Sequence, residues 1–483
     1  MRNKFALEDY EPVTPSPRRR HFDLPAQEDD TPEIRALEPI VIIESPSQPE
    51  RALRAASAPR FAHLPNPPIQ QRPPASWILK RGHGLSFCGL FVFTFLVYFR
   101  PYELFPSLAW LSRSALVVAI LTLAVFVPTQ LGLENSITAR LREIKLALGL
   151  LLTGLLSIAV ALDWALAFQG VVELFKVVVI FIVMVNVLRT EKRLRRLIQL
   201  ALFASCVLSA AALSDYLSGN LVLQGRRIAG LIGGLFSNPN DLALHLVTMI
   251  PISLTLFLGS RGPLKKSAYL VCSVLLMTGL VATFSRGGFL GFLCVIGFLA
   301  WKIARRNRVI FGVVALTLVM AAVALAPSAY RSRLATTDDD SALARTDELK
   351  RSVLVAARHP LFGVGMDNYI LYSNTNKATH NAYTQVAAEM GILALVLYVW
   401  FLVSPFNRLR RVEAATRTGK RKPPAFYLAI GLQASLVGYI VVSFFASVAY
   451  QWYVYYLVAY AICLGRLTFA DSTLSKPSIS NQK

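Results

Sequence analysis

The segment SALVVAILTLAVFVPTQLGL, at residues 114–133, contains no charged side chain. A helix rises about 1.5 Å per residue, so this segment is long enough to cross roughly 30 Å of bilayer hydrocarbon. Similar apolar runs recur along the chain, at 84–99, 146–162, 171–188, 197–217, 240–259, 268–284, 288–303, 309–326, 385–405, 426–445 and 449–465. The sequence therefore predicts an all-α polytopic integral membrane protein with about twelve transmembrane helices.

The positive charge of the chain follows the same pattern. Of the 483 residues, 54% are hydrophobic and 16% are charged, yet the net charge is +22. The basic residues gather in alternate loops between the apolar runs, at 140–145, 189–196, 261–266, 302–308 and 408–422. Because basic residues near span ends are retained in the cytoplasm, both termini are expected to be cytoplasmic. Topology thus accounts for most of the charge, and it removes the motive for a nucleic-acid partner.

Polar tails flank the apolar region. Residues 1–82 hold 14 of the 26 prolines and hardly any apolar run, so they cannot bury enough surface to offset chain entropy. We expect a disordered, proline-rich cytoplasmic tail at 1–82, a transmembrane domain at 83–466 and a cytoplasmic C-terminal tail at 467–483. The first tail is either an idle solvated segment or a docking arm for a cytoplasmic partner.

One connection is much longer than the others. The predicted topology places residues 327–384 outside, as a large periplasmic loop, and a connection of this length is usually functional or disordered. Leu349, Val353 and Ala356 recur at helical spacing. They predict a helix over 345–358 that stops before Pro360.

Two histidines lie in this outer loop, His359 and His380. His380 comes one turn ahead of the apolar run 385–405, which puts its ring at the outer membrane surface. A histidine with an ordinary pKa of about 6.5 can accept a proton from a hydroxyl group at neutral pH. The alternative for His380 is an interfacial polar residue that only satisfies hydrogen bonds.

Arginines form a second group on the predicted outer side. Arg286 lies in a very short turn at the membrane boundary, where an unpaired charge costs about a few kcal/mol. Arg226 and Arg227 precede a glycine-rich stretch. A guanidinium binds phosphate oxygens through two parallel hydrogen bonds, so a lipid diphosphate is a fitting partner. For Arg286 the alternative is snorkelling toward lipid headgroups.

Several polar residues occur at or inside apolar runs. Asn240 or Asp241 is expected to cap the helix that follows. His245, one turn further along, either faces the same cavity as the arginines or is a hydrogen-bonded intramembrane histidine. Glu173 and Lys176 are expected to form an ion pair.

Other kinds of chemistry find little support in the sequence. The acidic triplet 338–340 is better explained as a solvated run than as a cation site. The glycines at 363 and 365 lack the preceding strand and the third glycine of a nucleotide-binding fingerprint. The chain contains no P-loop and no GxSxG motif, so the energy for any reaction must come with the substrate.

Four motifs resemble the core of the O-antigen ligase and polymerase family. They are RIAG at 227–230 leading to SNPN at 237–240, TFSRGG at 283–288, HPLFGVG at 359–365, and THN at 379–381 followed by EMG at 389–391. The resemblance covers residues 225–405, and all of its motifs fall on the predicted outer side. Their order and their shared side make the match specific.

The resemblance implies a fold similar to the GT-C membrane glycosyltransferases and a reaction on a glycan linked to a polyprenyl diphosphate such as undecaprenyl diphosphate. No cofactor and no metal is implied, and direct attack would invert the anomeric configuration. By motif, the implied site residues are His380 as the base or acceptor-orienting residue, Arg226, Arg227 and Arg286 as the diphosphate clamp, and Asn240, His359, Asn381 and Glu389 in supporting roles.

The acceptor implied by the resemblance is either lipid A-core or another growing glycan. The first makes the protein an O-antigen ligase of lipopolysaccharide biosynthesis, and the second makes it a polysaccharide polymerase. In both cases we expect a multi-pass protein of the cytoplasmic (inner) membrane, surrounded by membrane lipid, with its active site facing the periplasm. A transporter of lipid-linked glycans is the rival, but it predicts internal repeats and interrupted midplane helices, and no convincing repeat occurs.

Overall fold

The computed structural model describes residues 77–104, 106–219, 238–303, 340–374, 377–417 and 422–474. All of them belong to one compact unit, and within them every regular element is a helix. The prediction of an all-α polytopic membrane protein is therefore confirmed. The predicted tail at 1–82 lies outside the described residues up to 76, while 77–82 already belong to the first helix.

The helices fall into two sets by length. The long ones are α2 (Trp77–Phe99), α4 (Ser114–Glu134), α5 (Arg142–Ser157), α6 (Trp164–Val187), α7 (Glu191–Leu217), α8 (Pro239–Gly259), α9 (Pro263–Ala282), α10 (Arg286–Ile303), α13 (Asp340–Arg358), α15 (Ile392–Ala415), α16 (Pro424–Val442) and α17 (Trp452–Leu474). The short ones are α3 (Pro101–Leu104), η2 (Pro106–Arg113), η3 (Ile158–Val160), η4 (Asn368–Tyr372), α14 (Ala382–Met390) and η5 (Ser443–Phe445).

Ten helices of the described ranges are long and apolar enough to cross a membrane. They are α2, α4 with η2, α5 with η3, α6, α7, α8, α9, α10, α15, and α16 with η5. Each corresponds to one of the predicted apolar runs. The run at 309–326 lies outside the described residues. The last run, 449–465, corresponds to α17, which is not among the ten and which continues to Leu474, beyond the boundary expected at 466.

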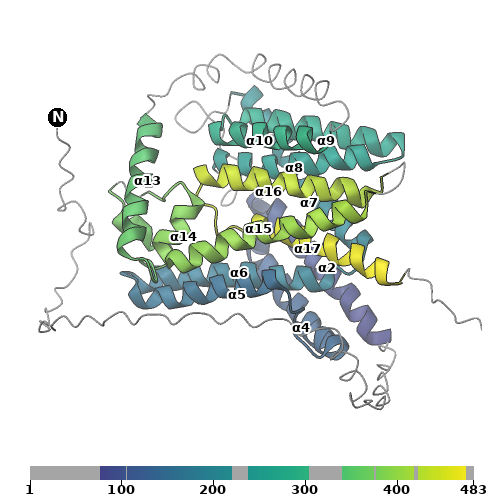
Figure 1. The fold of residues 1–483 in the computed structure, drawn as a ribbon, viewed down its shortest axis with the longest axis horizontal. Coiled ribbons are helices and arrows are strands. Elements are labelled where there is room, and N and C mark those ends of the chain that lie inside the picture. The colour runs from purple at the N-terminus through teal and green to yellow at the C-terminus, as the bar shows by residue number, and fades with distance from the viewer. Residues whose placement is uncertain are drawn as a thin grey trace, which may run out of the picture. The chain divides into compact units, whose positions relative to one another are not determined.

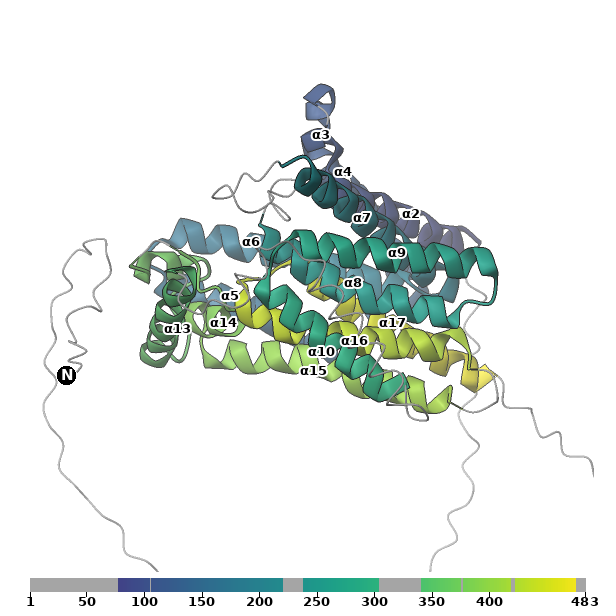
Figure 2. The ribbon, with the colours of Figure 1, turned by 90° about the horizontal axis from the view of Figure 1, so that it is seen from above.

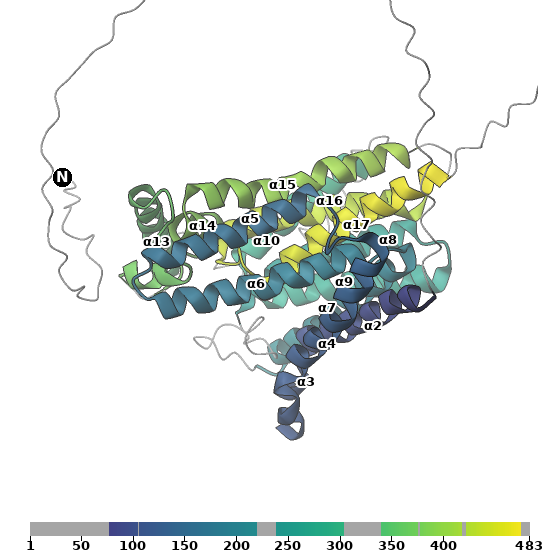
Figure 3. The same cartoon turned by 90° about the horizontal axis from the view of Figure 1, so that it is seen from below.

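The helices form a bundle with a buried centre and an apolar periphery. The apolar windows of α8 and α16 are 78% and 72% buried, whereas those of α4 and α9 are only 22% buried. Outward-facing apolar side chains suit a lipid surrounding. Figure 1 shows α16 between α10 and α15, with α13 crossing the bundle at one end. Figures 2 and 3 show α14 at this same end and the α2–α4 pair away from it.

Glycines bring α16 against α8 at the centre. A Cβ atom added at Gly438 would lie 2.8 Å from side-chain atoms of Val247 and Val295. Small residues allow this close helix packing, which membrane bundles use in place of a hydrophobic driving force. The packing fixes where α16 ends, and η5 follows directly at the end of the bundle that α13 crosses.

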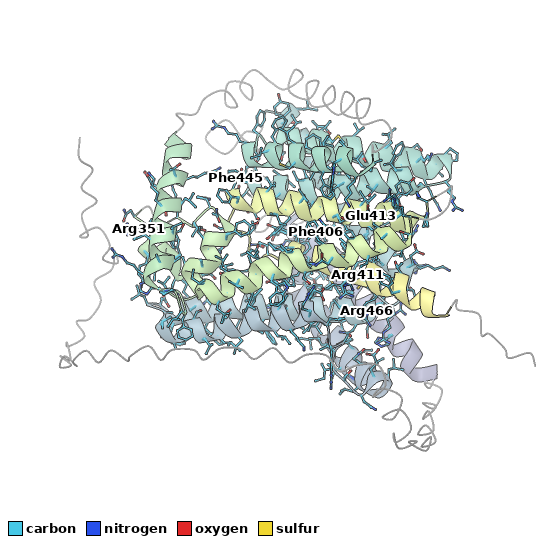
Figure 4. All side chains as sticks on the ribbon, viewed as in Figure 1. Arg351, Phe406, Arg411, Glu413, Phe445 and Arg466 are labelled. Carbon is cyan, nitrogen blue, oxygen red and sulfur yellow. The ribbon has the colours of Figure 1, made fainter. Side chains whose placement is uncertain are left out.

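Ion pairs gather at the opposite end of the bundle. Glu143 is 1% exposed and accepts hydrogen bonds from Ser404 at 2.8 Å and from Arg408 at 3.3 Å. Lys302 pairs with Glu413 at 2.7 Å. Figure 4 shows Glu413 at the end of the bundle away from α13. Lys302 and Arg408 belong to basic segments that the charge pattern assigns to the cytoplasm.

The last helix, α17, is buried although it is rich in tyrosine. Tyr453, Tyr455, Tyr456 and Tyr460 are each at most 2% exposed. The hydroxyl of Tyr456 shares a 2.9 Å hydrogen bond with Thr94 of α2. Arg466 donates to the carbonyl of Val185 in α6 at 2.6 Å. Tyr456 and Arg466 therefore find partners inside the bundle, whereas the buried hydroxyls of Tyr453 and Tyr460 have none within the described ranges.

The run predicted at 385–405 is not one continuous helix. It is divided into α14 and α15 at Gly391, whose φ is +89°. The helix expected at 345–358 is present as α13 and ends at Arg358, but it begins five residues earlier, at Asp340. Glu173 and Lys176 form the expected ion pair, at 2.5 Å.

Candidate functional site

A cavity of about 430 Å³ opens at the end of the bundle near α13. Its lining residues are Asn240, Phe284, Arg286, Gly287, Leu290, Arg345, Thr346, Leu349, Thr379, His380, Asn381, Phe444 and Phe445. They come from α8, the α9–α10 turn, α10, α13, the segment before α14, and η5. Figure 4 shows Phe445 at the end of α16 on the side of α13. The cavity therefore unites segments that are up to two hundred residues apart in the sequence.

Four of the predicted site residues meet in this cavity: Asn240, Arg286, His380 and Asn381. Two others, His359 and Glu389, do not line it. Arg226 and Arg227 lie outside the described residues.

Arg286 is held at the first position of α10. The preceding turn places Phe284 at φ +51°. The Ser285 hydroxyl accepts a hydrogen bond from the Gly288 backbone N–H at 3.2 Å, which caps the helix. The guanidinium thus stands beside the positive end of a helix dipole, an arrangement that favours an anion.

Asn240 ties α8 to this turn. The Ser285 hydroxyl donates to Asn240 Oδ1 at 3.0 Å. The sequence predicted Asn240 or Asp241 as the cap of α8. In the structure the cap is Asn238, whose side chain accepts a hydrogen bond from the Asn240 backbone N–H at 2.9 Å. The prediction was wrong because Pro239 already occupies the first helical position, a place that proline favours. Asn240 is therefore left to connect the start of α8 to the start of α10.

His380 lines the cavity in a strained backbone conformation. Its φ is +52°, in the left-handed region. Such a conformation costs about 1–2 kcal/mol in a residue other than glycine and tends to occur at functional sites. Phe284 and His380 both show it, and both line the cavity.

Asn381 fixes the backbone beside His380. Its Oδ1 accepts hydrogen bonds from the backbone N–H groups of Tyr383 at 2.9 Å and Thr384 at 3.0 Å, so it caps α14. Asn381 is only 2% exposed, and within the described ranges its Nδ2 has no hydrogen-bond partner. A buried amide donor at the wall of a cavity can bind an oxygen of a ligand.

Burial and charge hold His380 in its neutral form. Burial lowers the pKa of His380 below its usual value, and the positive charges of Arg345 and Lys377 lower it further. Glu348 acts in the opposite direction. A neutral imidazole at pH 7 can accept a proton, which is the property required of a general base.

The motif at 359–365 supports the site without entering the cavity. Val364 N–H donates to the Ala388 carbonyl at 2.9 Å, Gly365 N–H to the Glu389 carbonyl at 3.0 Å, and Ile392 N–H to the Pro360 carbonyl at 2.8 Å. Gly391, at φ +89°, brings the two backbones together. This segment therefore fixes the α14–α15 break and, through α14, the position of His380.

His359 packs away from the cavity, with its ring 6.0 Å from that of Tyr372. Glu389 is 4% exposed and accepts a hydrogen bond from the Tyr450 hydroxyl at 2.9 Å. Burial raises the pKa of Glu389, and the nearby carboxyl of Asp367 raises it further. Glu389 thus belongs to a buried polar contact between α14 and the segment before α17.

His245 is also buried, and its Nε2 shares a hydrogen bond with the Ser205 hydroxyl at 2.8 Å. This arrangement fits the predicted role of a hydrogen-bonded intramembrane histidine.

Sequence reasoning missed the contribution of α13. Arg345 and Thr346 of this helix line the cavity, as do Phe444 and Phe445 of η5. The periodic apolar residues of α13 predicted the helix, but an arginine in the first turns of an amphipathic helix is ordinarily interpreted as solvated. Its position relative to His380 depends on contacts between distant segments.

The fold and the cavity together describe a polytopic membrane protein whose reactive side chains gather at one end of the bundle. Residues 271–399 match the family model for O-antigen ligase. The predicted resemblance to O-antigen ligases and polymerases is therefore confirmed over this part of the chain. The matched segment includes Arg286, His380, Asn381 and Glu389, and it leaves Asn240 outside. No curated protein matches the chain.

Proposed function

We propose that this protein transfers a glycan from a polyprenyl diphosphate to an acceptor hydroxyl on the outer side of the cytoplasmic membrane, as an O-antigen ligase does. The observation that carries the proposal is one cavity lined by both His380, from the segment before α14, and Arg286, from the start of α10. The reaction needs a proton acceptor on one side of the anomeric carbon and a cation on the other.

Arg286 suits the leaving-group side. A diphosphate that leaves the anomeric carbon gains negative charge on its bridging oxygen. A guanidinium at the start of α10 can bind two of its oxygens, and the helix dipole adds to the attraction. This stabilisation grows as the bond breaks, so it lowers the barrier rather than only the ground state.

His380 suits the acceptor side. Its neutral ring accepts the proton as the acceptor hydroxyl attacks the anomeric carbon. One carbon–oxygen bond forms, the bond to the diphosphate breaks, and polyprenyl diphosphate departs as an anion. Direct displacement inverts the anomeric configuration, and in this scheme the cations are supplied by the chain itself. Asn381 donates its amide N–H to a sugar or phosphate oxygen.

The remaining lining residues suit a lipid-linked substrate. Phe284, Leu290, Phe444 and Phe445 give the cavity an apolar part next to its polar part. The volume of about 430 Å³ holds the sugar and diphosphate around the reacting bond but not a long glycan. The glycan and the prenyl chain must then extend beyond the cavity, the first into water and the second into lipid.

The position of the cavity supports an outward orientation. Phe445, which lines it, lies at the end of the bundle opposite Glu413, where Lys302 and Arg408 form ion pairs. Because basic loops are retained in the cytoplasm, the cavity end would face the periplasm. An interfacial position at one end also favours an enzyme over a transporter, whose substrate site lies near the membrane midplane.

The test is the glycan profile of a strain that lacks this protein, complemented with the wild type, with His380→Ala or with the control His359→Ala. If the protein is a ligase, the deletion strain and the strain with His380→Ala should show bare lipid A-core and accumulated full-length lipid-linked glycan. Restoration is expected with the wild type and with His359→Ala. Accumulated single repeat units would instead identify a polymerase, and an unchanged profile in the deletion strain would refute the proposal.

A further inference from the structure

The helix α13 is anchored firmly beside the cavity. Glu348 is 4% exposed and accepts hydrogen bonds from the Tyr369 hydroxyl at 2.7 Å and from the Ser373 hydroxyl at 2.8 Å. Arg351, one turn further along and visible in Figure 4, donates to the Tyr372 carbonyl. Buried, charge-assisted hydrogen bonds of this kind are stronger than neutral ones. They fix α13 against η4 and leave its first turns over the cavity.

Arg345 lies one turn before this anchor and lines the cavity with Thr346 and Leu349. Residues three apart share a helix face, so the side chains of Glu348 and Arg345 point to the same side of α13. Arg345 therefore reaches the cavity from a helix whose position is set by Glu348.

Arg345 reaches the cavity from α13, which packs against α14, the helix that His380 precedes. Its charge acts on the imidazole, together with that of Lys377, while Glu348 opposes them. Arg286 reaches the cavity from α10, which packs against α8 and α16. The two arginines thus come from different parts of the bundle, one next to the helix of the proposed base and the other with the proposed leaving-group site.

We propose that Arg345 is a recognition residue for an anionic oxygen, phosphate or carboxylate, carried by the acceptor; this inference rests on the proposed function. In a direct displacement the attacking hydroxyl and the departing diphosphate lie on opposite sides of the anomeric carbon. Arg286 serves the departing side, so a cation beside His380 meets the molecule that brings the hydroxyl. A guanidinium selects phosphate and carboxylate by its paired N–H groups, and Lys377 adds positive charge on that side.

The experiment measures acceptor binding without turnover. Full-length protein in phosphatidylcholine nanodiscs is titrated with lipid A-core purified from a strain that lacks this protein, in native, dephosphorylated and carboxyl-reduced forms, with no donor present. Arg345→Gln is expected to weaken binding of the native acceptor by about ten- to a hundredfold, the usual effect of losing a hydrogen bond between charged groups. Removal of one kind of anionic group from the acceptor should weaken its binding to the wild type as much as Arg345→Gln weakens binding of the native acceptor. That group, phosphate or carboxylate, is then the one that Arg345 recognises.

Lys350→Gln is the matched control. Lys350 lies on the same helix, pairs with the exposed Asp347 at 3.7 Å and does not line the cavity. The control removes the same charge from α13 and is expected to leave the dissociation constant of the acceptor unchanged.

Three results would overturn the inference. The first is that the wild type and Arg345→Gln bind the native acceptor equally. The second is that the wild type binds all three acceptor forms equally, and the third is that the wild type binds no acceptor at all. A parallel titration with a polyprenyl-diphosphate glycan should be unaffected by Arg345→Gln, and a loss there alone would assign Arg345 to the donor. If the wild type binds the acceptor through Arg345 but transfers nothing, the proposed function fails and the recognition role stands.

Discussion

Asn381 performs two tasks that substitutions can separate. Its Oδ1 caps α14 through hydrogen bonds of 2.9 and 3.0 Å, and its Nδ2 is a buried donor at the cavity wall. Asn381→Ala removes both. The loss of the cap is expected to cost about 1 kcal/mol of stability. Loss of one hydrogen bond to a charged substrate oxygen should cost about 1.5–3 kcal/mol more in transition-state binding, or about ten- to a hundredfold in kcat/KM.

Asn381→Asp and Asn381→Ser keep an oxygen that can cap the helix but lose the amide donor. Both are expected to retain the melting temperature of the wild type in detergent. Both should still lose about tenfold or more in glycan transfer by proteoliposomes that contain donor and acceptor. A larger loss in Asn381→Asp than in Asn381→Ser would report repulsion between the added carboxylate and the diphosphate.

The outcomes can refute each task independently. If Asn381→Ala melts at the wild-type temperature, the cap contributes nothing to stability. If both capping variants transfer glycan at the wild-type rate, the amide is not a substrate ligand, and Asn381 serves only to position the backbone at His380.

Further expectations concern His380, Arg286 and the helix break at Gly391. His380→Ala should reduce kcat/KM by about 10²–10⁴-fold while His359→Ala stays near wild type in the same transfer assay, and equal losses would remove the distinction between them. Since burial and Arg345 disfavour the imidazolium, the acidic limb of the kcat/KM profile for the wild type should lie below pH 6.5; a limb above that value would contradict His380 as the base. Arg286→Lys should lose about tenfold or more because a point charge lacks the paired donors, and full activity in that variant would mean that charge alone suffices. Gly391→Ala should lower the melting temperature, because φ is +89° and the new Cβ would lie 2.6 Å from a backbone carbon, whereas Gly297→Ala, in open space on α10, should leave it unchanged or raise it.

The sequence predicted the membrane-crossing helices well because hydropathy is a local, additive property. The segment 114–133 needed no tertiary context, and the structure has it as α4, 114–134. The break at Gly391 was missed for the opposite reason. An apolar run continues across it, and the carbonyls that meet Gly391 come from a segment thirty residues earlier.

The site was predictable in part. His380 and Arg286 were predicted as site residues because a charge or an ionisable ring at a membrane boundary is costly and needs an explanation. Arg345 carried no such signal, since an arginine on an amphipathic helix is ordinarily solvated. Its place at the cavity depends on the Glu348 anchor, a contact between two parts of the predicted outer loop that no local pattern reveals.

The tyrosine-rich α17 bears on how the protein is made. Its aromatic hydroxyls and Arg466 weaken its preference for lipid, and it is not among the ten helices of the described ranges that are long and apolar enough to cross a membrane. Two of its polar groups bond helices that precede it in the chain, through the Tyr456–Thr94 and Arg466–Val185 hydrogen bonds. Part of the stability of α17 in the bilayer would then come from its contacts with helices that precede it rather than from its own hydrophobicity. Its insertion would connect the last described helix to the first.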